Sequence, residues 1–240
     1  MWVFFLYLVF ILGHILHYFS IFANIICIPL KRTPVSFESL KLTAPLTANL
    51  ETLAFTVPKP IQAKVFTRIK GGQDMIIVGP EGSGKSTLFV LSVIAQLKFA
   101  FEMAPRALFM VPTKEKGIAL ETYLRDLGTN MNLRVAGMYN HVDIEYQREL
   151  LRDGLDIVIG TPDRILALYI RSGINLTKLK FFIIEDAEEI IKQNQQVIIK
   201  NIADNLGKCQ HLMSASETSD KLSKLGGYFL INPLTVYCEE

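Results

Sequence analysis

Short apolar runs alternate along the chain with longer stretches in which apolar residues recur every three or four positions. Runs of four or five mostly apolar residues are typical of buried strands, and the longer spacing is typical of helices that bury one face. Strands that alternate with helices predict an α/β fold, in which helices cover both faces of a mainly parallel sheet. The predicted strands are residues 74–78, 107–111, 133–137, 156–160, 180–184 and 211–214, and the clearest helices are residues 87–101 and 115–127.

The first thirty residues differ from the rest because they contain no Lys, Arg, Asp or Glu. This apolar segment is long enough to cross a bilayer, which takes about 20 residues. Lys31 and Arg32 follow directly and would keep the rest of the chain on the cytoplasmic side. Three interpretations stay open for residues 1–30: a membrane anchor, a signal peptide without its usual basic start, and translated sequence foreign to the protein.

Composition narrows the class of protein. Half of the 240 residues are hydrophobic and the mean hydropathy is +0.30, which excludes a disordered chain. The formal net charge of +2 argues against nucleic-acid binding that depends on overall charge, although a local basic patch could still bind. Cys27, Cys209 and Cys238 form no disulfide framework and no metal motif, so we expect a reducing compartment and no disulfide partner.

Residues 79–86, Gly-Pro-Glu-Gly-Ser-Gly-Lys-Ser, match the phosphate-binding pattern G-x4-G-K-[ST]. They lie between a predicted strand and a predicted helix, which is the context that this loop requires. Glycines let backbone N–H groups surround phosphate oxygens, and the positive end of the helix faces the anion. The pattern predicts ATP with Mg²⁺, held by Gly82, Ser83, Gly84, Lys85, Ser86 and Thr87, with Lys85 on the β and γ phosphates and Ser86 on the metal.

Further motifs precede and follow this loop, and together they make residues 34–237 resemble the first RecA-like domain of DEAD-box ATP-dependent RNA helicases. Residues 58–62, Pro-Lys-Pro-Ile-Gln, resemble the Q motif of that family. The resemblance assigns the adenine contacts to Gln62 and to Phe37, which stands at the position of the upstream aromatic that stacks on the base. Phe55 also matches a family aromatic, but Ala54 replaces the glycine that usually precedes it.

Two tetrapeptides resemble the RNA-binding loops of the family. Residues 112–115, Pro-Thr-Lys-Glu, are similar to motif Ia, and residues 161–164, Thr-Pro-Asp-Arg, to motif Ib. In the family these loops hold the sugar–phosphate backbone without reading bases. Lys114 lacks the fork of the usual arginine, and the carboxylate of Asp163 departs from the pattern because it repels a phosphate. The RNA contacts implied by the resemblance are Pro112, Thr113, Lys114, Gly137, Thr161 and Arg164.

Residues 185–188, Glu-Asp-Ala-Glu, occupy the position of the DEAD motif, directly after a predicted strand. The resemblance implies that Glu185 holds Mg²⁺ through water and that Asp186 activates the attacking water, so both count with Lys85 as catalytic candidates. Each carboxylate has the wrong length by one methylene, and a displacement of about 1 Å can cost on the order of 100-fold in rate. We therefore expect ATP binding to survive better than turnover.

Residues 214–216, Ser-Ala-Ser, resemble motif III, in which Ser214 and Ser216 would couple the ATP site to the RNA site. The resemblance implies the ATP-binding half of an RNA-dependent ATPase or helicase that uses Mg²⁺, holds RNA and works with a second RecA-like domain in cis or in trans. We expect residues 1–30 to be the apolar segment, residues 31–240 to be RecA-like domain 1, and the second domain to be absent, which would leave the isolated domain inactive or weak.

Two other functions stay open at this point. A degenerate helicase domain could bind RNA or a protein and hydrolyse little ATP, and a membrane-tethered P-loop NTPase could act without RNA. The expected location is the cytoplasm or the nucleus, or the cytoplasmic face of a membrane if residues 1–30 are an anchor.

Overall fold

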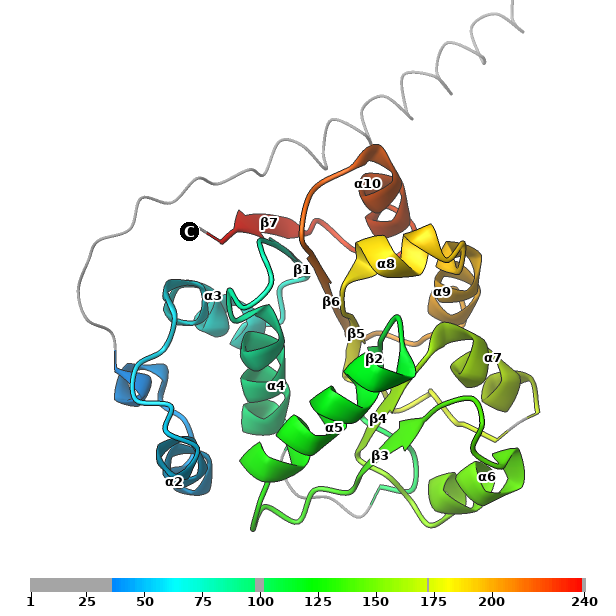
Figure 1. Cartoon of the computed structure of the whole chain (residues 1–240), viewed down its shortest axis with the longest axis horizontal. Coiled ribbons are helices and arrows are strands. Elements are labelled where there is room, and N and C mark those ends of the chain that lie inside the picture. The colour runs from blue at the N-terminus through cyan, green and yellow to red at the C-terminus, as the bar shows by residue number, and fades with distance from the viewer. Residues whose placement is uncertain (1–35, 98–101, 172, 239–240) are drawn as a thin grey trace, which may run out of the picture.

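The computed structural model describes residues 36–97, 102–171 and 173–238. Within these ranges seven strands form one sheet in the order β3-β4-β2-β5-β6-β1-β7, and all neighbouring strands are parallel (Figure 1). The strands are β1 (Met75–Val78), β2 (Ala107–Met110), β3 (Val135–Met138), β4 (Ile157–Gly160), β5 (Phe181–Ile184), β6 (Gln210–Ala215) and β7 (Leu234–Tyr237).

Helices connect the strands and cover both faces of the sheet (Figure 1). Several helices begin at a residue whose side chain accepts a backbone N–H of the first turn, as Thr113, Asp143 and Ser219 do. The helices are η1 (Phe37–Leu40, a 3-10 turn), α2 (Ala44–Thr52), α3 (Pro60–Lys70), α4 (Lys85–Gln96), α5 (Lys114–Leu127), α6 (Ile144–Arg152), α7 (Pro162–Ile170), α8 (Ala187–Lys192), α9 (Gln196–Ala203) and α10 (Asp220–Gly226).

Alternate strand residues divide the interior into two apolar cores, one on each face of the sheet. In β1, Met75 and Ile77 pack with α2 to α5, while Ile76 and Val78 pack with α6 to α10. Because each strand is buried on both faces, it reads as a continuous apolar run rather than as an alternating one. The predicted α/β fold with a parallel sheet covered on both faces is therefore confirmed.

The six predicted strands all exist, with ends that agree to within two residues. The sequence missed β7, because its four residues mix polar and apolar types at the edge of the sheet. The predicted helix 87–101 starts earlier, at Lys85, and ends at Gln96. None of the helices in the described ranges has both the length and the apolar sequence needed to cross a bilayer, and the predicted segment 1–30 lies outside those ranges.

The end of α2 carries the aromatic residue Phe55 toward the carboxyl edge of the sheet. The N–H of Phe55 donates to the Leu50 carbonyl at 2.8 Å and the N–H of Ala54 donates to the Glu51 carbonyl at 2.9 Å. These two bonds close the helix in a Schellman motif, which places Ala54 in the left-handed region with φ of 59°. Glycine is the residue that normally takes this position, since a Cβ is disfavoured there.

Replacing Ala54 with glycine is expected to stabilise the chain. The Ala54→Gly change removes the strain of the left-handed conformation, but it also increases the conformational entropy of the unfolded chain. The net effect is an increase of about 0.5–1 kcal/mol in the free energy of unfolding. Ala48 lies exposed inside the same helix, so Ala48→Gly should instead lower the free energy of unfolding by about 1 kcal/mol. Urea denaturation of the three proteins measures both values. Equal destabilisation by the two glycines would contradict the assigned strain.

Candidate active site

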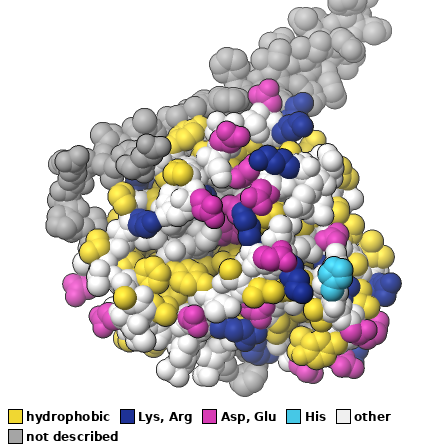
Figure 2. Space-filling view, in the orientation of Figure 1, with side chains coloured by type: hydrophobic (Ala, Val, Ile, Leu, Met, Phe, Trp, Pro, Cys, Tyr) yellow, Lys and Arg dark blue, Asp and Glu magenta, His cyan; other side chains and the backbone are white. Residues whose placement is uncertain are grey.

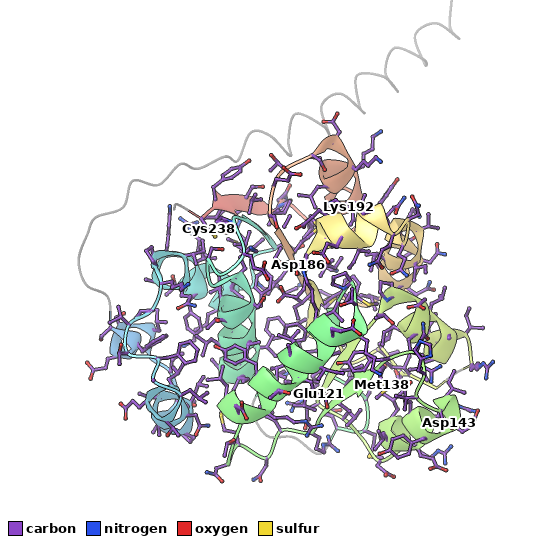
Figure 3. The ribbon with its side chains drawn as sticks, in the orientation of Figure 1. Glu121, Met138, Asp143, Asp186, Lys192 and Cys238 are labelled. Atoms are coloured by element: carbon purple, nitrogen blue, oxygen red, sulfur yellow. The ribbon has the colours of Figure 1, made fainter. Side chains whose placement is uncertain are left out.

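A cleft of about 510 Å³ lies at the carboxyl edge of the sheet. In Figure 2 acidic and basic side chains lie close together on the face that it opens to, and Figure 3 places Asp186 at the centre of that face. Parallel strands bring the loops that follow them to one edge, so residues distant in sequence meet there. The predicted residues that line the cleft are Gln62, Gly82, Gly84, Lys85, Ser86, Thr87, Glu185, Asp186 and Ser216, whereas Ser83 lines a smaller pocket behind the loop.

The loop of residues 79–84 links β1 to the first turn of α4. Gly82 and Gly84 have φ values of 77° and 95°, which only glycine adopts without strain. The buried Lys85 turns back into this loop, where its Nζ donates to the carbonyls of Gly79 at 2.5 Å and Pro80 at 2.8 Å. An ammonium group that is held by neutral carbonyls alone can transfer to a phosphate, which forms stronger charge-assisted hydrogen bonds.

Glu185 follows β5 and is the buried acid of the cleft, with only 4% of its surface exposed. Ser86 and Ser214 both donate hydroxyl hydrogen bonds to its Oε2, at 3.0 Å and 2.9 Å. Its Oε1 is buried without a hydrogen-bond partner. Burial raises the pKa of Glu185 to about 7, with a further rise from the charge of Asp186, although the Ser214 hydrogen bond opposes the change. An unpartnered oxygen on a buried carboxylate fits a hydrated Mg²⁺, a hard cation that prefers oxygen ligands.

Asp186 lies beside Glu185 with φ of 47° and donates its backbone N–H to Ser214 Oγ at 3.0 Å. Lys116, from the first turn of α5, donates to Asp186 Oδ2 at 2.5 Å and to Glu189 Oε1 at 2.8 Å. Burial works against the charge of Lys116, but its hydrogen bonds to these carboxylates outweigh that effect and raise its pKa. Asp186 is therefore paired with a cation.

Sequence reasoning missed Lys116, although one signal could have found it. Thr113 begins α5 at the carboxyl edge of the sheet, and its Oγ1 accepts the N–H of Lys116 at 3.3 Å. A residue in the first turn of a helix that starts at this edge lies close to the other loops. The predicted end of strand 107–111 therefore indicates that Lys116, in the helix that follows, lies near the other loops of this edge.

The apolar end of the cleft is built from Phe55 and Tyr123, whose ring centroids lie 6.0 Å apart. Burial raises the pKa of the Tyr123 phenol, which donates to Thr87 Oγ1 at 3.2 Å. Sequence reasoning had not singled out Tyr123. Two aromatic rings beside the phosphate loop can accept a flat heteroaromatic base.

Gln62 is almost fully buried at the start of α3. Its Oε1 accepts the N–H of Lys59 at 2.9 Å, and its Nε2 donates to the Gly84 carbonyl at 3.4 Å. Lys59 also donates from its Nζ to the Gly82 carbonyl. The predicted Q-motif residue therefore connects α3 to the phosphate loop.

Phe37 does not reach the cleft. Only 5% of its surface is exposed, and it packs in the apolar core with Leu40 and the α3 side of the sheet. Phe37 and Leu40 are the two large apolar side chains of the short η1 turn, and both are buried in this core. The structure therefore places the predicted base-stacking residue outside the cleft that Gln62 lines. Phe55 occupies the aromatic position in the cleft instead.

Ser216 connects the end of β6 to α8. Its Oγ donates to Glu188 Oε1 at 2.6 Å, and its backbone N–H donates to the same oxygen at 3.0 Å. Ser214 binds Glu185 and Asp186 as described above, so the two predicted coupling serines each contact the acidic motif at residues 185–188. The structure brings these two motifs together.

The predicted RNA residues lie along the other half of the same edge. Pro112, Thr113 and Lys114 follow β2, Gly137 lies in β3, and Thr161 and Arg164 follow β4, and these three strands are neighbours. None of these six residues lines the cleft. The structure therefore separates the sheet edge into an ATP half and a second half that carries the motif Ia and Ib residues.

Arg164 and Asp163 are engaged within the protein. Arg164 Nε donates to Gln147 Oε1 at 2.6 Å and its guanidinium also donates to the Val142 carbonyl. Asp163 accepts a hydrogen bond from the Asn140 amide. These contacts order the loop after β3 against the start of α7.

The sequence is similar to known proteins over most of its length. A family model described as DEAD/DEAH box helicase matches residues 59–225. The DEAD-box ATP-dependent RNA helicase CshA of Streptococcus pneumoniae is 28% identical over 203 residues, which are 83% of this chain and 38% of CshA. The ATP-dependent RNA helicase DeaD of Escherichia coli is 30% identical over 158 residues, which are 65% of this chain and 25% of DeaD. The chain thus spans well under half the length of these relatives.

Among solved structures, a DEAD box protein from the hyperthermophile Methanococcus jannaschii matches with a TM-score of 0.81 at 24% identity. The match covers 85% of this chain and 56% of that chain. At this level of identity the likeness shows the fold alone, and it confirms the predicted RecA-like fold.

The raised pKa of Glu185 predicts a pH-dependent effect of the Glu185→Gln change. The folded chain holds this proton up to a pKa of about 7, against 4.5 for the ordinary carboxyl, so the contribution of Glu185 to stability falls as pH rises through that window. Glutamine cannot ionise and keeps an oxygen for Ser86 and Ser214. Between pH 5 and pH 8, the free energy of unfolding of the variant should therefore rise by roughly 2 kcal/mol relative to that of the original chain.

Urea denaturation of both proteins at pH 5 and pH 8 measures this difference. Glu51→Gln in α2, where the carboxylate is exposed, is the matched control and should show no comparable change. A gain that is the same at both pH values would contradict the buried, protonated state of Glu185.

Proposed function

We propose that this chain, which belongs to the DEAD/DEAH box helicase family, binds ATP with Mg²⁺ in the cleft and forms the ATP-binding half of an RNA-dependent ATPase. One observation carries the proposal: the phosphate loop and the buried acid meet through the Ser86–Glu185 hydrogen bond of 3.0 Å. Membership of the family confirms the resemblance read from the motifs, and it argues against a P-loop NTPase unrelated to RNA.

The residues present suit the triphosphate and its metal. Lys85 would exchange the Gly79 and Pro80 carbonyls for β and γ phosphate oxygens, and the Ser86 hydroxyl and Glu185 Oε1 are the oxygen groups available to a hydrated Mg²⁺. When bound, Mg²⁺ neutralises the charge that develops on the phosphates. The aromatic pair of Phe55 and Tyr123 would hold the adenine, and the buried Gln62 lines the same cleft.

Hydrolysis requires a base that orients a water toward the γ phosphate, and Asp186 is the carboxylate in position for it. The ammonium of Lys116 lies 2.5 Å from Asp186 Oδ2. The hydrogen bond from Lys116 occupies a carboxylate oxygen that the attacking water would need. This pairing, together with the shorter side chain, supports slow turnover by the proposed ATPase.

The half of the edge after β2, β3 and β4 is the surface that we propose for RNA. Lys114 is partly exposed there, and the first turns of α5 and α7 offer backbone N–H groups to phosphates. Arg164 would order its loop rather than contact a phosphate, because its guanidinium is bound to Gln147 and Val142. Such contacts hold a backbone and do not select a sequence.

The proposal includes a second RecA-like domain, in cis or in trans, that completes the ATP site and the RNA surface. The relatives support this part because each is much longer than the chain. We also propose a cytoplasmic or nuclear location, which suits the free cysteines Cys209 and Cys238.

ATP binding tests the proposal directly. The chain should bind ATP in the presence of Mg²⁺, and Lys85→Ala should weaken the affinity at least tenfold, since the charge-assisted contact to phosphate is lost. Lys221 is exposed in α10, far from the loop in sequence, and Lys221→Ala should leave the affinity unchanged. Isothermal titration calorimetry gives the three dissociation constants. Equal affinity of all three proteins would refute nucleotide binding by this loop.

Breaking the Lys116–Asp186 pair should speed hydrolysis. The Lys116→Gln change removes the ion pair, and we expect the turnover number to rise severalfold with little change in KM, because Asp186 Oδ2 becomes available to the attacking water while the phosphate loop is untouched. The assay uses the chain joined to a second RecA-like domain, with RNA present. Lys200→Gln is the matched control, since it breaks an exposed lysine–aspartate pair within α9 and its C-cap. A fall in turnover would show instead that Lys116 itself supports the reaction, and no turnover in either form would favour a binding module.

A further inference from the structure

A second cluster of titratable side chains lies at the opposite edge of the sheet from the cleft. Asp74 directly precedes β1, and Cys209 directly precedes β6, which pairs with β1 in parallel. These positions are at the amino ends of the strands, whereas the ATP cleft is at the carboxyl ends. Cys209 and His211 are two residues apart along an extended segment, which places their side chains on the same face.

Three side chains of this cluster form a continuous chain of contacts. The ring Nδ1 of His211 lies 3.1 Å from Asp74 Oδ2, and its Nε2 lies 3.5 Å from Cys209 Sγ. The backbone N–H of His211 donates to Asp74 Oδ1 at 2.8 Å, and the N–H of Ile231 donates to Asp74 Oδ2 at 2.8 Å. The carboxylate is thus fixed by two backbone donors and in turn orients the imidazole toward the sulfur.

The surroundings of His211 leave Asp74 and Cys209 as the titratable groups that contact its ring. From β5 and the turn after α10, the ring meets the aromatic side chains of Phe182 and Phe229, with centroids at 6.2 Å and 5.6 Å. Burial disfavours the imidazolium, but the hydrogen bonds to Asp74 and Cys209 outweigh it and raise the pKa of His211 to about 9. The imidazole is therefore a cation at neutral pH.

We propose that Cys209 is a modification site: His211, which is oriented through Asp74, stabilises the negative charge that the Cys209 sulfur develops as it reacts with hydrogen peroxide and with small electrophiles. Thiolates beside a histidine cation are the reactive form of cysteine. Neither the ATP site nor the RNA surface uses these three residues.

The chemistry with peroxide balances within the cluster and the reagent. The Cys209 sulfur attacks one peroxide oxygen, so that an S–O bond forms and the O–O bond breaks, and the hydroxide that leaves takes the proton that the Cys209 thiol gives up and becomes water. The sulfur loses two electrons to give a sulfenic acid, and the peroxide is reduced. Cys209 is a partly exposed residue, as the reaction with a small reagent requires.

Cys238 provides an internal control, because it is also a partly exposed free cysteine. Its side chain packs beside the phosphate loop at Gly79, and Figure 3 shows it near the end of β7. Among the hydrogen bonds of the described residues, none joins its sulfur to a histidine. The two thiols therefore differ in the one feature that the proposal depends on.

The test is the rate of alkylation of each cysteine by iodoacetamide in the intact chain, followed by peptide mass spectrometry at several pH values. An ordinary thiol with a pKa near 8.5 is only about 1% thiolate at pH 6.5. The His211 cation stabilises the charge on the attacking sulfur of Cys209, so we expect Cys209 to react about tenfold faster than Cys238 at this pH.

Two variants separate the effect of His211 from access to the sulfur. His211→Gln and Asp74→Asn should each lower the alkylation rate at Cys209 to near that at Cys238, and the rate at Cys238 should be the same in both variants as in the original chain. Peroxide followed by a sulfenic-acid trap should label Cys209 before Cys238 in the original chain, and this order decides if neither variant folds. Equal alkylation rates for the two cysteines in the folded original chain, or an unchanged rate at Cys209 in a folded variant, would overturn the proposal.

Discussion

The burial of one carboxylate constrains the whole cleft. Glu185 stands at the end of the central strand β5, where 4% of its surface is exposed, and two serine hydroxyls from different elements bind the same oxygen. Ser86 belongs to the helix after the phosphate loop, and Ser214 belongs to β6. An acid removed from water in this way is costly unless it is protonated or partnered. Its requirement for a partner links the loop, the acidic motif and the end of β6.

The parallel sheet explains why the ATP cleft and the surface proposed for RNA lie side by side at one edge. The ATP half of the edge follows β1, β5 and β6 and includes one face of α5, whereas the half proposed for RNA follows β2, β3 and β4. The two halves meet between β5 and β2, where Lys116 of α5 pairs with Asp186 after β5. This ion pair joins the acidic motif to the helix that motif Ia begins. The pair offers a physical link between the halves.

Much of this could be predicted from the sequence, and the rest depended on packing. The apolar runs gave the strands, and the loop pattern placed Lys85 and Ser86 because their spacing is local. The burial of Phe37, the aromatic role of Phe55 with Tyr123, and the engagement of Arg164 all depend on which distant side chains fill the same space. The cluster of Cys209, His211 and Asp74 could not be predicted from the sequence for the same reason, since Asp74 lies more than a hundred residues from its partners.

A crystal structure of the chain with Mg²⁺ and a non-hydrolysable ATP analogue tests the central claim most directly. We expect the Lys85 ammonium to leave the Gly79 and Pro80 carbonyls for phosphate oxygens, the metal's water shell to occupy the free side of Glu185, and the adenine to lie against Phe55 and Tyr123. A nucleotide bound elsewhere, or a Lys85 that stays on the two carbonyls with the analogue present, would contradict it.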